Sequence, residues 1–484
     1  MRLLPQAVSR LGWWSLAIAF GLLFASELLE QSMFVDGLWY AAISRNLAQG
    51  QGSFWHPHFS ALIFSEFHEH PPLVFGLQAL FFRLFGDHFW TERLFVSLHY
   101  LATAVVLVGI WRQLFPEGSP YRYRSMWFLP ILLWQCNIVS YYFLPANLLE
   151  ASLSLFDLLA IWVLLVPEGK RVWSRQLLAG QLIGLALLSK GPVGAFPLAF
   201  WICHQLAFGQ LSWWEAGKRT LMLTLSSLLG LVLLCGLFPE ALVAFGHYFD
   251  EQLLASLEGT RRQYYYRDSR LYILGQLLWT LLPMLLLGGL AMAYGHARKG
   301  RMNKQTFSWA LFFGLTALSA SLPLVVSPRQ ALPYLLPSLP YFSLSIAVVS
   351  APFALRCLLW GHRTLAVVRP WMEWGGLALL ILLAGWIYGK SGQSNQRDAS
   401  LIEDVQLIGP VLGESQLVSS DTFDMYISGY LMRWYQVSLD TSQQIRPYWL
   451  TSKGNTEIPT GYKKVDLPTQ QFDLYEKDES IGGH

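Results

Sequence analysis

The residue types best suited to chemistry begin at Asp36, directly after a hydrophobic stretch. Asp36 opens the run Asp36-Gly37-Leu38-Trp39-Tyr40. Helical spacing would place Asp36 and Tyr40 on one face, because residues four apart are neighbours on a helix. A carboxylate beside an apolar helix at a membrane surface is costly unless it is paired or used in chemistry, for example as a general base. It could equally be a carboxylate that caps a helix, so the residue types leave both interpretations open.

Further along the same polar stretch, His68, Glu69 and His70 stand directly before Pro71 and Pro72. Imidazole and carboxylate groups are ligands for divalent metals, so this trio could bind one. Consecutive residues rarely all face one ion, and a solvated loop is the alternative. A histidine at position 70 carries full charge only below roughly pH 6.5.

Lys190 lies in the run Ser189-Lys190-Gly191-Pro192 between two apolar segments. Glycine and proline let the backbone turn while the lysine is presented, which favours contact with a phosphate or with a polar cavity. The alternative is a lysine that reaches to the lipid interface.

Three arginines form a second group of cations, Arg261, Arg262 and Arg329. Arginine binds phosphate through two parallel hydrogen bonds, so Arg261 and Arg262 could hold a phosphorylated ligand. Surface ion pairs or lipid headgroups would also account for them.

Glu150 follows Asn147-Leu148-Leu149 where an apolar segment begins. By its place alone it would be a carboxylate favoured by the helix dipole at a helix start.

The elements that must position these residues are membrane-spanning helices. Of 484 residues, 54% are hydrophobic and 13% are charged, whereas a soluble domain has about 25% charged residues. The lengths of the apolar runs, roughly 17 to 25 residues per crossing, predict about eleven spans. They cover residues 11–29, 93–114, 125–143, 149–166, 176–188, 193–208, 220–238, 271–294, 307–326, 331–349 and 371–388.

Lysine and arginine placement predicts a cytoplasmic N-terminus, because alternate loops between these spans are basic. Residues 31–92 and 239–270 are then outer loops of a transmembrane domain covering residues 1–388. Residues 389–484 lack a spanning run and contain strand-like stretches at 416–420, 434–439 and 462–467 beside an amphipathic stretch at 423–432. They predict a small α/β domain, extracytoplasmic or periplasmic, of a multi-pass protein in the cell inner (plasma) membrane.

Several motifs occur together in one order: Asp36, the Pro-Pro-Leu at residues 71–73, Arg93-Leu94, the Lys-Gly-Pro at 190–192, and Arg329 before Tyr334. In this order they resemble bacterial glycosyltransferases of the GT-C fold that use lipid-linked sugars. The resemblance covers roughly residues 11–350 and is greatest to lipid A aminoarabinose transferase and the protein O-mannosyltransferase superfamily. Relatives often carry a lysine before the Pro-Pro where this chain has His70.

The resemblance implies a glycosyltransferase that moves a hexose or pentose from a polyprenyl-phosphate donor, such as undecaprenyl phosphate. Asp36 and Glu150 would be catalytic, the latter where relatives usually carry aspartate. Lys190, Arg261, Arg262 and Arg329 would bind the donor phosphate. The substrate cavity would include Tyr40, His70 and Tyr334.

The acceptor would be lipid A, as in lipopolysaccharide modification, or another glycolipid, a glycan or a protein. Because the carrier phosphate leaves from one face while the acceptor attacks the other, inversion is expected. No cofactor is required on this interpretation, although a divalent metal could take part, and the partners are these substrates and membrane lipids. The small net charge of +3 gives no indication of nucleic-acid binding. The alternatives are a lipid or sugar transporter or flippase and a structural membrane subunit; the sequence shows no duplicated halves of the kind found in many transporters.

Overall fold

The computed structural model describes residues 3–117, 122–166, 172–255, 269–297, 303–364, 369–413, 417–421, 423–442, 444–455 and 457–478. The chain divides into two compact units, which we treat separately. The helical unit contains Met1–Leu28, Glu69–Val74 and Val96–Gly389. The mixed unit contains Leu29–His68, Phe75–Phe95 and Lys390–His484.

The helical unit is made almost entirely of apolar helices, as its composition requires. Its helices are α1 (Leu3–Phe20), η1 (Gly21–Ala25), α2 (Ser26–Leu29), α5 (Thr91–Leu114), η2 (Arg122–Met126), α6 (Leu129–Gln135), α7 (Ile138–Phe143), α8 (Leu149–Leu164), α9 (Val172–Lys190), η3 (Pro192–Ala199), α10 (Phe200–Phe208), α11 (Trp213–Leu237), α12 (Pro239–His247), η4 (Tyr248–Leu254), α14 (Tyr272–Ala297), α15 (Lys304–Ser321), η5 (Leu322–Val326), η6 (Leu332–Ser338), α16 (Leu339–Thr364) and α17 (Arg369–Lys390), a few of which begin or end across the unit boundary.

Each segment predicted to span the membrane falls largely on helix in this structure. Within the described residues, 6 helices are long and apolar enough to cross a bilayer. The count of about eleven crossings therefore stays a prediction. The segment predicted at 125–143 is broken, because Asn137 accepts a hydrogen bond from Val139 N at 2.9 Å and begins α7 anew after α6.

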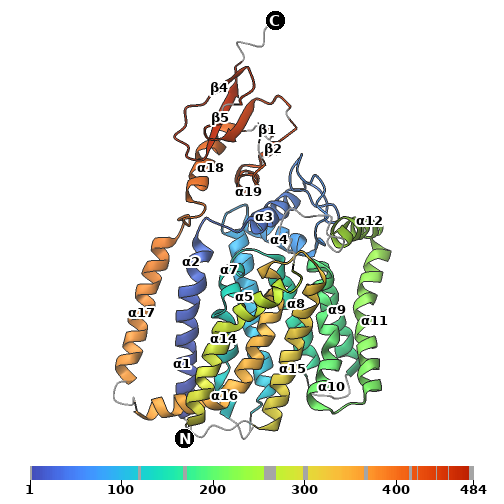
Figure 1. Ribbon diagram of the computed structural model, residues 1–484, viewed down its shortest axis with the longest axis vertical. Helices are drawn as coiled ribbons and strands as arrows, with labels where there is room; N and C mark the ends of the chain where they lie inside the picture. The colour runs from blue at the N-terminus through green and yellow to red at the C-terminus, as the bar shows by residue number, and fades with distance from the viewer. Residues whose placement is uncertain are drawn as a thin grey trace. The chain divides into compact units, whose positions relative to one another are not determined.

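Close approach of helix backbones holds the helical unit together. Gly180 of α9 faces Ser226 of α11 with no room for a Cβ atom, and Gln181 Nε2 donates to Ser226 O at 2.6 Å. Small residues allow such close contacts. In a bilayer the lipid is as apolar as the helix surfaces, so close packing of this kind drives helix association. Figure 1 shows α1 beside α17, and Gly21 accordingly meets the side chain of Leu383.

Outward-facing positions of this unit are apolar. On α11, for example, Leu221, Val232 and Leu237 are 58%, 65% and 74% exposed. A surface of this kind would be unfavourable in water and suits lipid contact. The multi-pass membrane character predicted from composition is thus supported by the structure.

The mixed unit combines helices with one small sheet. Its helices are α3 (Val35–Ala48), α4 (Leu73–Phe85, whose first two residues belong to the helical unit), α18 (Ala399–Leu412) and α19 (Met425–Tyr435). Its strands are β1 (Leu417–Ser420), β2 (Ser438–Asp440), β3 (Tyr448–Ser452), β4 (Tyr462–Lys464) and β5 (Phe472–Lys477).

The sheet has the order β2-β1-β3-β5-β4, visible in red and orange in Figure 1. β1 is parallel to β2 and β3, while β5 is antiparallel to β3 and β4. The segment between β1 and β2 contains α19, as a parallel crossover requires. The small α/β fold predicted for the C-terminal residues is confirmed.

Buried charge pairs join the C-terminal residues to the polar stretch after the first helix. Arg433 of α19 contacts Asp87 at 2.6 Å and Glu92 at 2.9 Å, and it is 3% exposed. Arg45 of α3 reaches the same Asp87 at 3.5 Å. The division predicted at residues 388 and 389 put residues 31–92 with the membrane helices, whereas most of that stretch groups with residues 390–484 in the structure.

Candidate functional site

Lys190 and Glu150 form a buried ion pair in the helical unit. Glu150 is the second residue of α8, and Lys190 is the last residue of α9. Nζ of Lys190 contacts Oε1 of Glu150, with side chains that are 11% and 2% exposed. α8 and α9 pack against each other, so a helix start and a helix end meet here. A carboxylate at a helix start and a cation at a helix end each complement the helix dipole.

Gly191 lets the chain turn away directly after Lys190. Its φ and ψ are 80° and −150°, a backbone conformation open essentially to glycine alone. The hydroxyl of Tyr248 donates to the Lys190 carbonyl at 3.4 Å. A Cβ atom on Gly191 would collide with that hydroxyl. The glycine therefore permits both the turn and the approach of Tyr248.

Tyr334 lies beside this pair. Nζ of Lys190 stands 5.0 Å from the centre of the Tyr334 ring, a distance at which a cation is attracted to an aromatic face. Burial, with Tyr334 adding to it, raises the pKa of Tyr248 to about 12. The Tyr248 phenol therefore stays protonated and can donate a hydrogen bond.

A buried glutamine, Gln330, holds the segment that carries Arg329. Its Oε1 accepts from Ile273 N at 2.9 Å, and its Nε2 donates to Arg270 O at 2.6 Å and to Ser327 O at 3.1 Å. These bonds connect the turn between η5 and η6 to the start of α14. Gln330 thus positions Arg329.

His70 is a neutral member of the group. Burial first, and then the positive charges of Lys190 and Arg329, hold its pKa well below the usual range. The imidazole is therefore uncharged at neutral pH, and the site has two fixed cations rather than three. We call Glu150, Lys190, Arg329, Tyr334 and His70 the cation cluster. The cluster offers an anion two cations, an imidazole and a phenol hydroxyl.

Asp36 and Tyr40 belong to the mixed unit. Both lie on α3, where Asp36 is the second helical residue and Phe34 is the N-cap. Tyr40 is 6% exposed, and its ring packs on Phe75 with centroids 5.6 Å apart. Asp36 contributes to the electrostatic surroundings of Tyr426 in α19. The helical placement of the pair agrees with the sequence, and their roles stay predictions.

The remaining predicted site residues fall into two classes. Arg261 and Arg262 lie outside the described residues. Of the trio His68, Glu69 and His70, only His68 belongs to a group with metal-binding geometry among the described residues, and its companions there are His56 and Glu66.

Two site residues escaped the sequence analysis, Tyr248 and Gln330. Each acts through a contact with a residue 58 or 57 positions away. The residue types carry no local signal of such contacts.

Known proteins resemble this chain in part of its sequence and in its fold. Residues 69–237 match the sequence model of the dolichyl-phosphate-mannose-protein mannosyltransferases. This segment contains His70, Glu150 and Lys190. No curated protein matches the chain in sequence.

Two solved structures resemble the whole chain. ArnT from Cupriavidus metallidurans bound to undecaprenyl phosphate has a TM-score of 0.63 and 16% sequence identity, covering 98% of this chain and 99% of that chain. ArnT from the same organism in the apo state has a TM-score of 0.62 at the same identity and coverage. The chain therefore has the GT-C fold seen in ArnT, and its residues 69–237 are similar to the dolichyl-phosphate-mannose-protein mannosyltransferases.

Proposed function

We propose that this chain is a glycosyltransferase that takes a hexosyl or pentosyl group from a polyprenyl-phosphate carrier. The observation that carries the proposal is the cation cluster, in which Lys190 and Arg329 both lie close enough to His70 to lower its pKa. Two cations, one of them paired with the Glu150 carboxylate, lie beside a neutral imidazole, and such a site can bind a phosphate. The related ArnT structure contains undecaprenyl phosphate, which is the carrier we propose here.

The chemistry follows from where charge develops. When the sugar leaves its carrier, negative charge grows on the phosphate oxygen that gives up the anomeric carbon. Lys190 and Arg329 would stabilise that charge, and groups held in place before the reaction do so most effectively. The Glu150 carboxylate holds Lys190 in position, a role compatible with its being 2% exposed. On this proposal Arg261 and Arg262 add further charge.

The acceptor half of the reaction is assigned to Asp36. It would take a proton from an acceptor hydroxyl or orient that hydroxyl for attack on the anomeric carbon. Attack opposite the leaving phosphate inverts the configuration. We propose lipid A, another glycolipid, a glycan or a protein as acceptor, on the outer face of the inner membrane.

The test uses purified protein in detergent with undecaprenyl phosphate as a binding probe and undecaprenyl-phosphate sugars as donors. Arg329→Ala should lower both donor binding and transfer at least about tenfold, because a charge-assisted contact contributes roughly 1.5 to 3 kcal/mol. The matched control is Lys218→Ala, which removes an exposed lysine of the same unit that stacks on Trp214.

Lys190 needs a paired change. Lys190→Ala alone would leave Glu150 buried beside no cation, and such a residue can unfold a protein. The double variant Lys190→Met with Glu150→Gln removes both charges together. Weakened binding of undecaprenyl phosphate in this folded variant supports the site. Binding and transfer at the wild-type level in both this variant and Arg329→Ala would refute it. Binding without any transfer by the wild-type protein would favour a flippase.

A further inference from the structure

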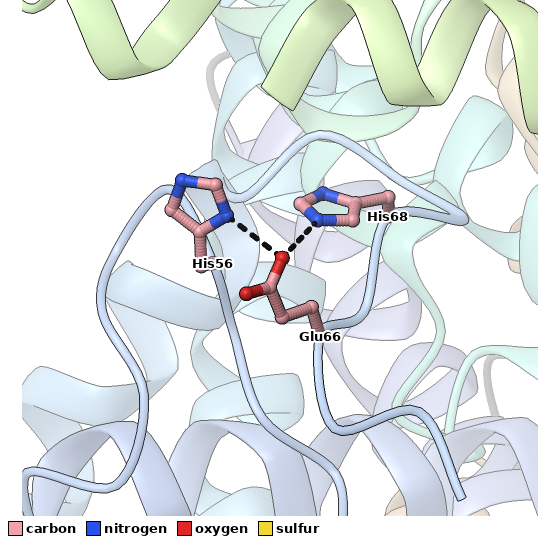
Figure 2. Close-up of side chains that lie close together, drawn as sticks. All are labelled: His56, Glu66 and His68. Atoms are coloured by element: carbon pink, nitrogen blue, oxygen red, sulfur yellow. Dashed lines mark hydrogen bonds and ion pairs between the residues drawn. The ribbon is translucent and has the colours of Figure 1, made fainter. Parts of the chain in front are cut away.

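Three metal-ligating side chains converge in the segment between α3 and α4. Nδ1 of His56 and Nε2 of His68 each lie 3.2 Å from the same oxygen of Glu66, Oε2. One ligand atom from each residue lies within 4.8 Å of the other two. Figure 2 shows the two rings facing the carboxylate from opposite sides.

Backbone hydrogen bonds hold the two arms that carry these ligands. His56 lies on the first arm, and Glu66 and His68 lie on the second. Phe67 N donates to Pro57 O at 2.7 Å, and Phe59 N donates to Phe64 O at 3.1 Å. The arms are therefore in register without help from the ligand side chains themselves.

The same segment is fixed to α3. Nδ2 of Asn46 donates to Phe59 O at 2.7 Å, and the Trp39 ring stacks on the Phe59 ring with centroids 4.1 Å apart. All of these residues belong to the mixed unit. Ligands on such a supported loop lose little freedom on binding an ion, which favours affinity.

The spacing of the ligand atoms suits a tetrahedral ion. Bonds of 2.0–2.2 Å to zinc put neighbouring ligand atoms about 3.3 Å apart, close to the 3.2 Å seen twice here. The two ring nitrogens, within 4.8 Å of each other, would need to approach by at most about 1.5 Å to complete such a site. Rotation of the His56 side chain, which is 27% exposed, can supply that movement.

The ligand types select the class of ion. Calcium and magnesium prefer oxygen ligands alone, whereas two imidazoles with one carboxylate suit zinc and other first-row transition metals. Neutral imidazoles bind through the nitrogens that now face Glu66, with their protons on the opposite nitrogens.

We propose that His56, Glu66 and His68 bind one divalent transition-metal ion, Zn²⁺ above all. Three protein ligands leave a fourth position open to water or to a substrate oxygen. The ion would connect the two arms of the segment more strongly than the hydrogen bonds of Glu66 with His56 and His68 do. Its role is independent of the phosphate contacts assigned to the cation cluster.

The experiment measures metal binding by the full chain in detergent, without a polyhistidine tag and after treatment with a chelator. We expect Co²⁺ to bind with one equivalent per chain and with the visible absorption of a tetrahedral site, and Zn²⁺ to displace it. His56→Ala, His68→Ala and Glu66→Gln should each weaken Zn²⁺ binding at least about tenfold, because each removes one of three ligands.

The matched control is His58→Ala, in the same loop. Nδ1 of His58 lies 2.9 Å from Ser65 O rather than in the group, so this change should leave Zn²⁺ binding unaltered. Glu66→Gln is an exposed and nearly isosteric change, and it keeps the test valid should a histidine variant fold poorly. Absence of a stoichiometric site, or equal loss in His58→Ala and Glu66→Gln, would overturn the proposal. Metal content is read independently of sugar transfer, so failure of one proposal leaves the other intact.

Discussion

At Asp36, a single substitution can remove the charge of the side chain while keeping its shape. Asp36 is the second residue of α3 and not its N-cap, which is Phe34. A capping hydrogen bond is thus not its main contribution to the helix. A carboxylate in the first turn still interacts favourably with the helix dipole, by about 0.3 to 1 kcal/mol.

Asp36→Asn therefore distinguishes a base from a helix-stabilising residue. The amide keeps the shape, so the protein should fold and still bind undecaprenyl phosphate. If the charge is needed to activate the acceptor, transfer should be at least about a hundredfold slower, since general base catalysis contributes 10²- to 10⁴-fold. Single-turnover transfer from bound donor is the measurement. Near-normal turnover would return Asp36 to helix stabilisation and make Glu150 the next carboxylate to test.

Binding of the donor should be coupled to protonation of His70. Its pKa is low because of burial and because Lys190 and Arg329 are nearby. A bound phosphate offsets those charges and should raise the pKa. Between the two pKa values the complex holds more protons than the free protein, so binding should strengthen as pH falls through that window.

Calorimetry in buffers of different ionisation enthalpy can measure this proton uptake. The phosphate itself gains a proton near pH 6, so the matched control is His70→Gln. At about pH 6 we expect the wild-type protein to take up more protons than His70→Gln on binding undecaprenyl phosphate. At about pH 8 the two should agree. Equal uptake at both pH values would show that His70 does not sense the phosphate.

Among the elements, the turn from α9 into η3 requires a glycine at position 191. Gly191 has a backbone conformation with positive φ, and Tyr248 of η4 packs where a Cβ atom would stand. Any side chain there would displace Tyr248 and tilt the end of α9, which carries Lys190.

Gly191→Ala should accordingly lower binding of undecaprenyl phosphate at least about tenfold, equivalent to 1.4 kcal/mol. The control is Gly209→Ala at the end of α10, where φ is also positive at 62° but no atom lies within 4 Å of the added methyl group. That variant should cost some stability, about 1 kcal/mol, and leave binding nearly unchanged. Thermal unfolding and probe binding are measured on both; parallel losses in the two variants would contradict the steric explanation.

The elements also show how far sequence reasoning reaches. The apolar helices could be predicted because each is recorded locally as a run of hydrophobic residues. Lys190 and Glu150 could be singled out because each stands at a helix end. Their pairing could not be predicted, since it depends on how α8 packs against α9. The contacts of Gln330 and Tyr248 were equally out of reach.

The metal ligands illustrate the same limit. Proximity in sequence suggested His68, Glu69 and His70, whereas the structure brings His56 from ten positions before Glu66 to the same place. A loop that folds back on itself brings residues together, and this proximity cannot be inferred from their spacing in the sequence.

At the scale of the whole molecule, the predicted orientation decides whether the cation cluster can meet its donor. The basic loops predict a cytoplasmic N-terminus, and about eleven crossings then put residues 389–484 on the outer side. Lys190 would lie at the outer face, where a lipid-linked sugar is available after it has been flipped across the membrane. Orientation is therefore a condition of the proposed reaction.

Single cysteines in a background without the four native ones can test this orientation. Gln396 and Lys304 are both exposed positions, one in the mixed unit and one at the start of α15. In intact cells or spheroplasts, an impermeant maleimide should label Gln396→Cys and leave Lys304→Cys unlabelled, because the bilayer blocks the reagent and basic loops stay inside. Permeabilisation should expose both, which controls for reactivity. Labelling of Lys304→Cys alone would place Lys190 on the cytoplasmic side, and the proposed use of an outward-facing donor would then be wrong.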